Sequence, residues 1–304
     1  MRLNVSKKVS LTAALWAVFV LASPTVAWAQ GGGTLDKVKS SGQITLAYRE
    51  SSIPFSYLDD KAQPTGFGHE ICLKIVEEVK KATGRADLKV NLQAVTSANR
   101  IPLLVNGTID IECGSTTNNS ERGKQVQFAT NYFYTGTRFL VKAGTQVGRI
   151  EDLKGKTIVS TTGTTNFKIL RQLNEEKKLG MELLGAKDHA ESALMVESGR
   201  AVAFGMDDIL LYGLRASAQN PASLAVVGEA IQVEPYAIML RKDDPAFKKL
   251  VDDTLAALMK SGEFTKLYAK WFLSPIPPKG INLNAPMSPE LTENLKALSD
   301  KPAT

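Results

Sequence analysis

The sequence predicts an α/β protein of two lobes, joined by two extended crossings, with a ligand cleft between the lobes. Three observations point to this fold class. The chain has 304 residues, of which 43% are hydrophobic and 22% charged, so two ordinary domains with a sizeable core are possible. Predicted strands and helices alternate in two separate runs. Two extended stretches without helical periodicity, at 131–141 and 232–241, follow the first and the second run.

The first 29 residues differ in kind from the rest of the chain. A basic start with Arg2, Lys7 and Lys8 precedes an apolar run at Leu11–Leu21, and Ala27-Trp28-Ala29 supplies an A-x-A cleavage pattern. The apolar run is well short of the roughly 20 residues that a membrane span requires. We therefore expect residues 1–29 to be a secretory signal peptide, cleaved near Ala29–Gln30, and the mature chain to be exported and soluble.

Charge and composition exclude several classes of function. Removing the three basic residues of the signal leaves 34 basic against 31 acidic residues, a net charge of only +3. No basic patch interleaved with aromatic residues is present, so we expect no nucleic-acid partner. The chain has only two cysteines and two histidines, which excludes zinc-cluster architectures. We expect neither a metal nor a cofactor.

The first lobe is predicted from alternating strand and helix patterns. A Gly-rich leader at 30–34 precedes the first helix, and an irregular, hairpin-like excursion at 53–68 follows the first strand. Ser97 is expected to cap the third helix, which ends at Gly107. The predicted strands lie at 44–48, 88–95 and 109–113, and the predicted helices at 35–40, 69–84 and 97–107.

The second lobe repeats the pattern, which favours mostly parallel strand pairing. Its expected strands are 156–161, 181–186 and 201–206, and its expected helices are 164–178, 190–198 and 208–216. Helices at 246–260 and 263–272 follow the second crossing, and a proline-rich strap leads to a weak helix at 289–298. We assign 34–134 and 235–275 to lobe 1, 135–234 to lobe 2, and 276–304 to the C-terminal strap and helix.

The two cysteines leave two interpretations open. Cys72 falls in a helical pattern and Cys113 at the end of an apolar strand, so a helix packed on that strand could bring them together. An oxidising compartment would permit a Cys72–Cys113 disulfide, whereas two buried free thiols are the alternative.

Enzymatic motifs are missing from the sequence. Gly155-Lys156-Thr157 lacks the earlier glycine that a phosphate-binding loop requires, because Ile150 occupies that position. Neither G-x-S-x-G nor H-E-x-x-H occurs. His69 stands beside Glu70 at a helix start, where a surface or capping role is expected. We therefore expect a binding protein and no enzyme.

Arginines and short polar residues gather instead at predicted strand ends and helix starts, which is where open α/β sheets bind ligands. Arg49 ends the first strand, Arg100 opens the helix after Ser97, and the loop 114–122 closes with Arg122. A cation in a first helical turn opposes the helix dipole, so Arg100 is expected either beside a bound anion or in solvent. Likewise, the loop 114–122 is either an anion-binding loop with Arg122 as its clamp or a capped polar loop. Gly163-Thr164-Thr165 forms a second possible anion pocket. In Met206-Asp207-Asp208 one aspartate is expected to cap a helix and the other could receive an ammonium group.

At this point the sequence resembles the periplasmic solute-binding proteins of polar amino acid ABC transporters, and most closely the glutamate/aspartate-binding members. The resemblance spans about residues 34–280. It is carried by RESSIPFSY at 49–57, TSANRIPLL at 96–104, NGTID at 106–110, ECGSTTNN at 112–119, AKDH at 186–189, ESGRAVAF at 197–204 and MDD at 206–208. It implies the type II periplasmic binding protein fold, a periplasmic location, and an inner-membrane ABC permease as partner.

The resemblance also implies a role for each matching residue. Thr117 and Arg122 would hold the α-carboxylate of the ligand, and Ser115 and Asp207 would receive its α-ammonium. Thr164 and Thr165 would add donors from the second lobe. The side-chain carboxylate would be bound by four further residues: Arg49, Ser97, Arg100 and His189.

We therefore expect a monomer that binds L-glutamate or L-aspartate by closing its lobes about crossings near 133–137 and 232–236. Three arginines and one aspartate would give the site a charge near +2, which a ligand of charge −1 partly neutralises. Three alternatives stay open. They are a dehydratase-like enzyme using Glu112 or Asp208 as acid or base, a sensory domain, and a binder of another polar amino acid. The sequence does not rank glutamate against aspartate, nor does it give the protonation state of His189.

Overall fold

The computed structural model describes Met1 and residues 32–303. The predicted signal peptide, apart from Met1, lies outside the described residues. Among the described helices, none combines the length and apolar character needed to cross a membrane.

The centre of the fold is a nine-stranded sheet whose order is β5-β1-β6-β12-β7-β10-β8-β9, with β11 paired to β7. Two long antiparallel strands, β7 and β12, run through its middle and pair from Val126↔Arg241 to Gly136↔Val233. Beyond that point β7 pairs with β10 and β11. The strands span Gln43–Tyr48 (β1), Lys89–Ala94 (β5), Ile111–Glu112 (β6), Val126–Lys142 (β7), Thr157–Thr161 (β8), Glu182–Ala186 (β9), Ala203–Asp207 (β10), Leu224–Val227 (β11) and Val233–Arg241 (β12).

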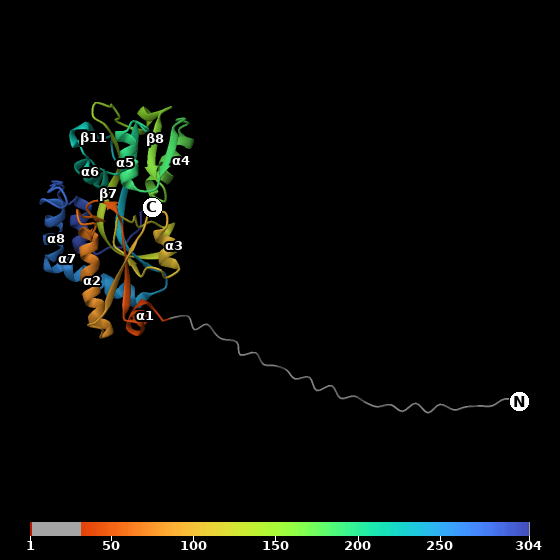
Figure 1. The fold of residues 1–304 in the computed structure, drawn as a ribbon, viewed down its shortest axis with the longest axis vertical. Helices are drawn as coiled ribbons and strands as arrows, with labels where there is room; N and C mark the ends of the chain where they lie inside the picture. Colours follow the sequence, from red (N-terminus) through yellow and green to blue (C-terminus); the bar gives the residue numbers. More distant parts are fainter. Residues whose placement is uncertain (2–31, 304) are drawn as a thin grey trace. The chain divides into compact units, whose positions relative to one another are not determined.

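Helices cover the two ends of this sheet as separate groups (Figure 1). We call β1–β6 with α1, α2, α3, α7 and α8 the first lobe, and β8–β11 with α4, α5 and α6 the second lobe. The helices span Thr34–Ser41 (α1), Phe67–Thr83 (α2), Arg100–Val105 (α3), Thr165–Glu176 (α4), His189–Glu197 (α5), Asp208–Ser217 (α6), Pro245–Ser261 (α7), Glu263–Phe272 (α8) and Pro289–Ala297 (α9). The two-lobed α/β fold is therefore confirmed, while the lobe boundaries given above stay predictions.

Strand direction is where the sequence prediction needs correction. Within each lobe the pairs β1–β5, β1–β6, β8–β9 and β8–β10 are parallel, as expected. The central pairs made by β7 and β12 are antiparallel. The reason is that these two strands carry the chain out of the first lobe and back again, so they must run in opposite directions. The hairpin-like excursion forms a small sheet of β2 (Ser51–Ser52), β3 (Ser56–Leu58) and β4 (Pro64–Thr65).

The core of the first lobe ties the crossings to its helices. Phe55 meets Phe133 and Tyr236, from β7 and β12, at ring-centroid distances of 4.9 and 5.2 Å. Phe133 in turn stacks on Phe272 of α8 at 5.1 Å. All of these rings are buried, and aromatic pairs of this kind stabilise a core beyond the area they bury. The first-lobe ends of β7 and β12 are therefore packed firmly against the core of that lobe.

A disulfide joins Cys72 of α2 to Cys113, with 5.9 Å between the two Cα atoms. The sequence left this bond open against free thiols, and the structure decides for the bond. Cys113 directly precedes the loop 114–122 that was predicted to bind an anion, so the bond fixes the start of that loop to α2.

The C-terminal strap returns to the same region. After α9, the carbonyl of Ser299 accepts from the backbone N–H of Asn131 on β7 at 2.9 Å, and the carbonyl of Asp300 accepts from the side chain of Asn118 at 2.7 Å. Ala303 forms an isolated bridge with Asn119. Residues 299–303 are therefore hydrogen-bonded to β7 and to the loop 114–122.

Candidate ligand-binding site

A narrow cavity, with about 170 Å³ of space between its lining atoms, lies where the two lobes meet, and eight of the ten predicted site residues line it. Its lining consists of Ser97, Arg100, Ser115, Thr117, Thr164, Thr165, Asn166, His189, Met206 and Asp207. The other two predicted residues, Arg49 and Arg122, hydrogen-bond to members of this lining. The folded chain therefore brings all ten together.

Arg49 directly follows β1 and is almost completely buried. Its Nη2 donates to the Ser97 hydroxyl at 2.9 Å and faces Nε2 of His189, from α5, at 3.3 Å. Burial, followed by the charge of Arg100, lowers the pKa of Arg49 to about 9. The prediction that Ser97 caps α3 is wrong, because Asn99 occupies the N-cap position. The Ser97 hydroxyl faces the cavity cluster instead.

The hydrogen bonds around His189 fix its tautomer. The Ser192 hydroxyl donates to the carbonyl of Asp188 at 2.9 Å, so its oxygen accepts from the Thr161 hydroxyl, also at 2.9 Å. Thr161, having spent its proton, accepts from Nδ1–H of His189 at 2.8 Å. Nε2 then carries a lone pair, which suits the guanidinium of Arg49 opposite it. Burial, with the charges of Arg49 and Arg100, holds the pKa of His189 well below its usual range, so the imidazole is neutral near neutral pH.

Arg100 and Arg122 complete the set of buried cations. Arg100 opens α3, and its Nη1 donates to the carbonyl of Ser115 at 3.4 Å. Arg122 donates from Nη1 to the carbonyl of Thr117 at 2.9 Å and from Nη2 to the carbonyl of Gly163 at 3.2 Å. Burial, then the charge of Arg100, lowers the pKa of Arg122 to about 10. Arg100 therefore lies close enough to affect both of the other guanidinium groups.

Asp207 is the acidic member of the predicted set and ends β10. One carboxylate oxygen accepts from Nδ2 of Asn166 at 2.7 Å, and the other accepts from the Tyr236 hydroxyl. Burial, then the charge of Glu234, raises the pKa of Asp207 to about 8. Asp207 occupies the N-cap position of α6 without a capping bond from its side chain. Its neighbour Asp208 accepts instead from the Thr135 hydroxyl at 2.7 Å.

Two carboxylates missing from the predicted site change its charge. Glu112 and Glu234 are both 0% exposed. Glu112, at the end of β6, accepts from the Thr116 hydroxyl at 2.5 Å, and Glu234, on β12, accepts from the hydroxyls of Thr117 and Thr165. Three arginines now face three carboxylates, so the expected charge near +2 is wrong. The formal charge is near zero, or near +1 when Asp207 is protonated.

Sequence signals for these two residues were weak but present. Glu112 opens the ECGSTTNN stretch, and Glu234 is the only charged residue between the start of its crossing and Arg241. A single carboxylate in an otherwise apolar extended stretch indicates a buried group with partners. Neither signal states which cavity the side chain would face.

The two threonines at the start of α4 differ in what they offer. Thr164 is the N-cap residue, and its hydroxyl accepts from the N–H of Phe167 at 3.0 Å while donating to the carbonyl of Thr161 at 2.7 Å. That hydroxyl is thus committed to the helix start. The Thr165 hydroxyl instead donates to Glu234 at 2.6 Å and lies 3.3 Å from the Thr117 hydroxyl of the first lobe.

Several buried polar atoms of the site have no hydrogen-bond partner within the described part of the chain. They are Nη1 of Arg49, Nε of Arg100, Oγ of Ser115, Oε1 of Glu112 and Oδ1 of Asn166. A buried donor or acceptor without a partner costs about 1–3 kcal/mol, and more when it is charged. Atoms of both kinds around one small cavity are suited to a ligand that carries charges of both signs. In residues 32–303 no group of three or more potential metal-ligating side chains occurs.

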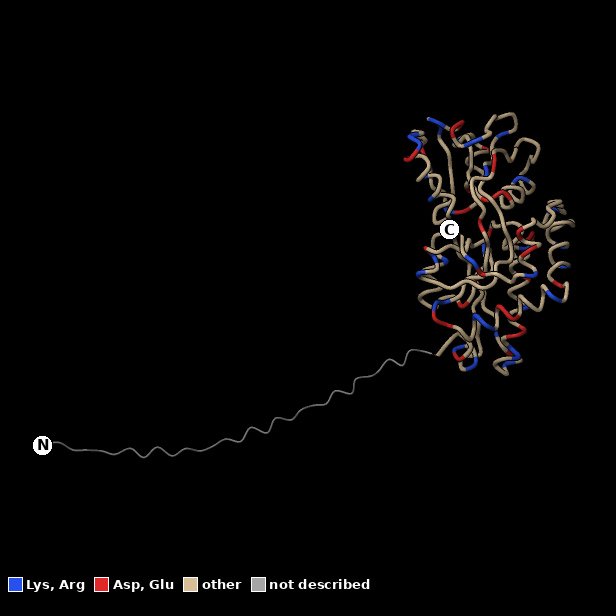
Figure 2. The backbone as a smooth tube through the Cα atoms, turned by 180° about the vertical axis from the view of Figure 1, so that it is seen from behind, with Lys and Arg blue, Asp and Glu red and all other residues tan. Residues whose placement is uncertain are grey.

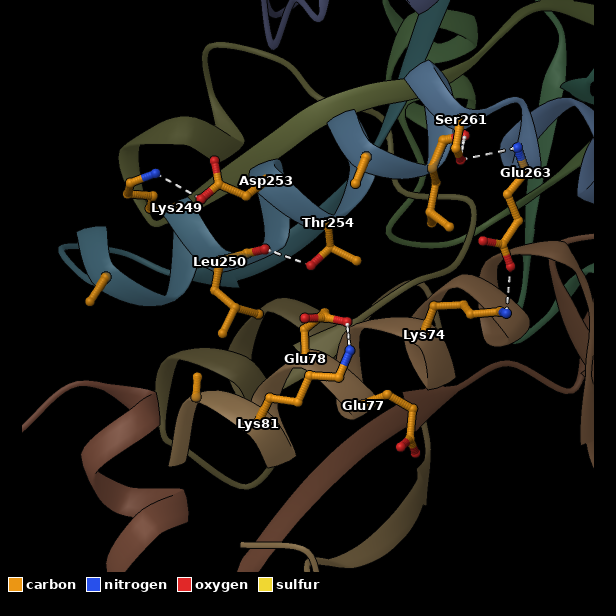
Figure 3. A pocket seen from close by; sticks show the side chains of 14 residues that line it. Lys74, Glu77, Glu78, Lys81, Lys249, Leu250, Asp253, Thr254, Ser261 and Glu263 are labelled. Atoms are coloured by element: carbon orange, nitrogen blue, oxygen red, sulfur yellow. Dashed lines mark hydrogen bonds and ion pairs between the residues drawn. The ribbon is translucent and has the colours of Figure 1, made fainter. Parts of the chain in front are cut away.

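A larger surface hollow lies elsewhere, between α2 and α7 (Figure 3). Six of its charged side chains are paired with one another: Lys74 with Glu263 at 2.5 Å, Lys81 with Glu78 at 2.7 Å and Lys249 with Asp253 at 2.7 Å. The seventh, Glu77, pairs with Lys80 at 2.8 Å. None of the predicted site residues lines it. In Figure 2 basic and acidic positions are likewise interspersed along the backbone of both lobes. The site is therefore distinguished by buried charges and small volume.

Comparison with known proteins agrees with this geometry. The family model for bacterial extracellular solute-binding proteins, family 3, matches residues 44–274. The chain is 51% identical over 285 residues to the L-glutamate/L-aspartate-binding protein of Pseudomonas aeruginosa, covering 93% of this chain and 94% of that protein. It is 50% identical over 270 residues to the glutamate/aspartate import solute-binding protein of Escherichia coli, covering 89% of each.

A solved structure shares the fold. The crystal structure of a mutant of the arginine-binding protein ArgBP from T. maritima matches with a TM-score of 0.70 and 25% identity, covering 78% of this chain and 98% of that one. The relatives are named as binding proteins, in line with the expectation that this chain is not an enzyme. On the extent of the family match and of the identity to these relatives, the chain belongs to the family 3 bacterial extracellular solute-binding proteins.

Proposed function

We propose that this protein binds L-glutamate or L-aspartate in the cavity between its lobes and delivers the amino acid to an inner-membrane ABC permease. The observation that carries the proposal is the convergence of three buried arginines with Asp207 around one small cavity. Relatives at 50–51% identity are named for the same two ligands. The protein would act as a monomer in the periplasm, after cleavage of the signal peptide near Ala29–Gln30.

Each charged group of the ligand has a partner of the opposite sign in this proposal. The α-carboxylate lies against Arg122, and the α-ammonium lies against Asp207, whose oxygens already accept hydrogen bonds. Ser115 and Thr117 flank these two groups, and the α4 start at Thr164 and Thr165 closes over them from the second lobe. The side-chain carboxylate lies against Arg49 and Arg100, with the Ser97 hydroxyl beside them.

His189 has a positioning role in this arrangement. Since its Nδ1–H is committed to Thr161, its Nε2 can accept from Arg49 but cannot donate to a carboxylate. We propose that His189 orients Arg49 from the second lobe. A neutral imidazole does this without adding a fourth positive charge to the pocket.

Binding would couple to closure of the lobes about the crossings. The ligand is captured on the first lobe, which supplies all three arginines, and the second lobe then adds Asp207, the α4 start and His189. A ligand drives closure only by the contacts it gains in the closed state. Glutamine would leave the Arg49–Arg100 pair facing an amide, and we expect discrimination of several kcal/mol against it, as for other broken buried charge pairs.

Isothermal titration calorimetry of the refolded, ligand-stripped mature chain against the twenty amino acids tests the binding proposal. Glutamate and aspartate should bind, while glutamine and asparagine serve as neutral isosteres and should bind far more weakly. Equal affinity for glutamine and glutamate would refute the proposed pocket. Fractionation of expressing cells with N-terminal sequencing tests the location, and a periplasmic product that starts at Gln30 is expected.

A further inference from the structure

Glu234 lies on the crossing β12 and is wholly buried at the junction of the two lobes. Its Oε2 accepts from the hydroxyl of Thr117, in the first lobe, at 2.5 Å and from the hydroxyl of Thr165, in the second lobe, at 2.6 Å. Its other oxygen accepts from the side-chain amide of Gln232. Every partner of this carboxylate is a donor, as an ionised carboxylate requires.

A count of protons decides what the two threonines can offer a ligand. A hydroxyl has one proton to donate and lone pairs to accept with. Both protons are spent on Glu234, and the two hydroxyl oxygens lie 3.3 Å apart on the cavity lining. Their remaining lone pairs can accept from an ammonium group. Neither hydroxyl can donate to a carboxylate, so Thr117 can serve an α-carboxylate only through its backbone N–H.

Asp207 extends this end of the cavity with a further acceptor. Asp207 lines the same cavity. Its Oδ1 accepts from Nδ2 of Asn166, which follows Thr165 in α4. Thr165 donates to Glu234 and the next residue, Asn166, donates to Asp207, so both carboxylates are held by the start of α4. Two threonine oxygens and one carboxylate match the three N–H bonds of an ammonium group, while the function proposed above assigns the carboxylate on the same ligand carbon to Arg122.

We propose that Glu234 determines the specificity of the site for the ligand's ammonium group, by holding the Thr117 and Thr165 hydroxyls with their lone pairs toward the cavity. This inference rests on the proposed function, since it assigns one end of the proposed ligand. It makes Glu234 a positioning residue that acts through two threonines without contacting the ligand.

The test compares two ligands on the Glu234→Gln variant of the mature chain. Glutarate is glutamate without its ammonium group, so the ratio of the two affinities reports on ammonium recognition alone. A glutamine at this position removes the negative charge and can turn its N–H groups toward the hydroxyls, which releases their protons to the cavity. We expect the glutamate-to-glutarate affinity ratio to fall by roughly ten- to hundredfold, the range for hydrogen bonds to charged groups.

Glu229→Gln is the matched control, since Glu229 is exposed and lies five residues earlier in the chain. Its ratio should equal that of the wild type. An unchanged ratio in a folded Glu234→Gln protein would overturn the inference, and so would an equal loss of both ligands, which indicates a purely structural role. Failure of the wild type to bind glutamate would instead refute the proposed function.

A second variant keeps the inference testable if Glu234→Gln does not fold, as judged by circular dichroism. Thr165→Val removes the acceptor oxygen and keeps the shape of the side chain. It should weaken glutamate roughly tenfold or more while changing glutarate much less. If glutarate weakens as much as glutamate, the Thr165 hydroxyl donates to a carboxylate and the inference is wrong.

Discussion

The Arg100→Met variant gives the most direct test of the proposed ligand pocket. Arg100 is 2% exposed, lines the cavity, and lies near enough to lower the pKa of both Arg49 and Arg122. Methionine keeps an unbranched side chain, shorter than that of arginine, and removes the charge. Breaking a buried charge pair by removing one partner costs about 3–5 kcal/mol. At about 1.4 kcal/mol per factor of ten, the affinity for glutamate should fall by about 10² to 10³ or more.

The free energy of unfolding of the Arg100→Met protein should not fall together with its affinity for glutamate. Because Arg100 repels two buried guanidinium groups in the ligand-free protein, its removal should leave the free energy of unfolding unchanged or increase it. Calorimetric titration measures the affinity, and urea unfolding measures the stability. Arg171→Met, at an exposed position of α4, is the control and should change neither. A folded Arg100→Met protein that binds glutamate within about threefold of the wild type would refute the reasoning.

Three further predictions concern stability, closure and pH. Replacing Cys72 and Cys113 together by alanine opens a loop with a sequence separation of 41 and should cost about 4 kcal/mol in urea unfolding; a loss below about 1 kcal/mol would contradict this. Gly163→Ala places a Cβ 2.5 Å from Cα of Ala98 across the cleft and should weaken glutamate binding. Gly155→Ala, also at positive φ but with no atom nearby, should not, and equal effects would refute the steric argument. In the ligand-free protein, the raised pKa of Asp207 means that its contribution is fully present at low pH and is lost as the pH rises from about 4 to about 8. The stability difference between wild type and Asp207→Asn should therefore shift against the wild type by up to about 1.4 kcal/mol per pH unit, and a flat difference would exclude this titration.

Much of the fold could be predicted because strand and helix periods are local properties. The pattern at 69–84 indicated α2, and the structure begins that helix only two residues earlier, at Phe67. The short strand β11 was missed, since Leu224–Val227 is a four-residue apolar run that a sequence alone does not separate from a loop. The strap after residue 274 lies beyond the family match, and its contacts with Asn118 and Asn131 depend on tertiary structure.

The sequence by itself determined the two-lobed α/β architecture and the set of ten residues that the folded chain gathers around one cavity. The hydrophobic period, the turn residues and the family motifs are properties of consecutive residues, so they can be recognised in the sequence alone. Only the tertiary structure decided the disulfide, the neutral tautomer of His189 and the charge balance of the site. These depend on which groups from distant parts of the chain are buried side by side, and Glu112 and Glu234 join the site only because folding buries them near its arginines and threonines.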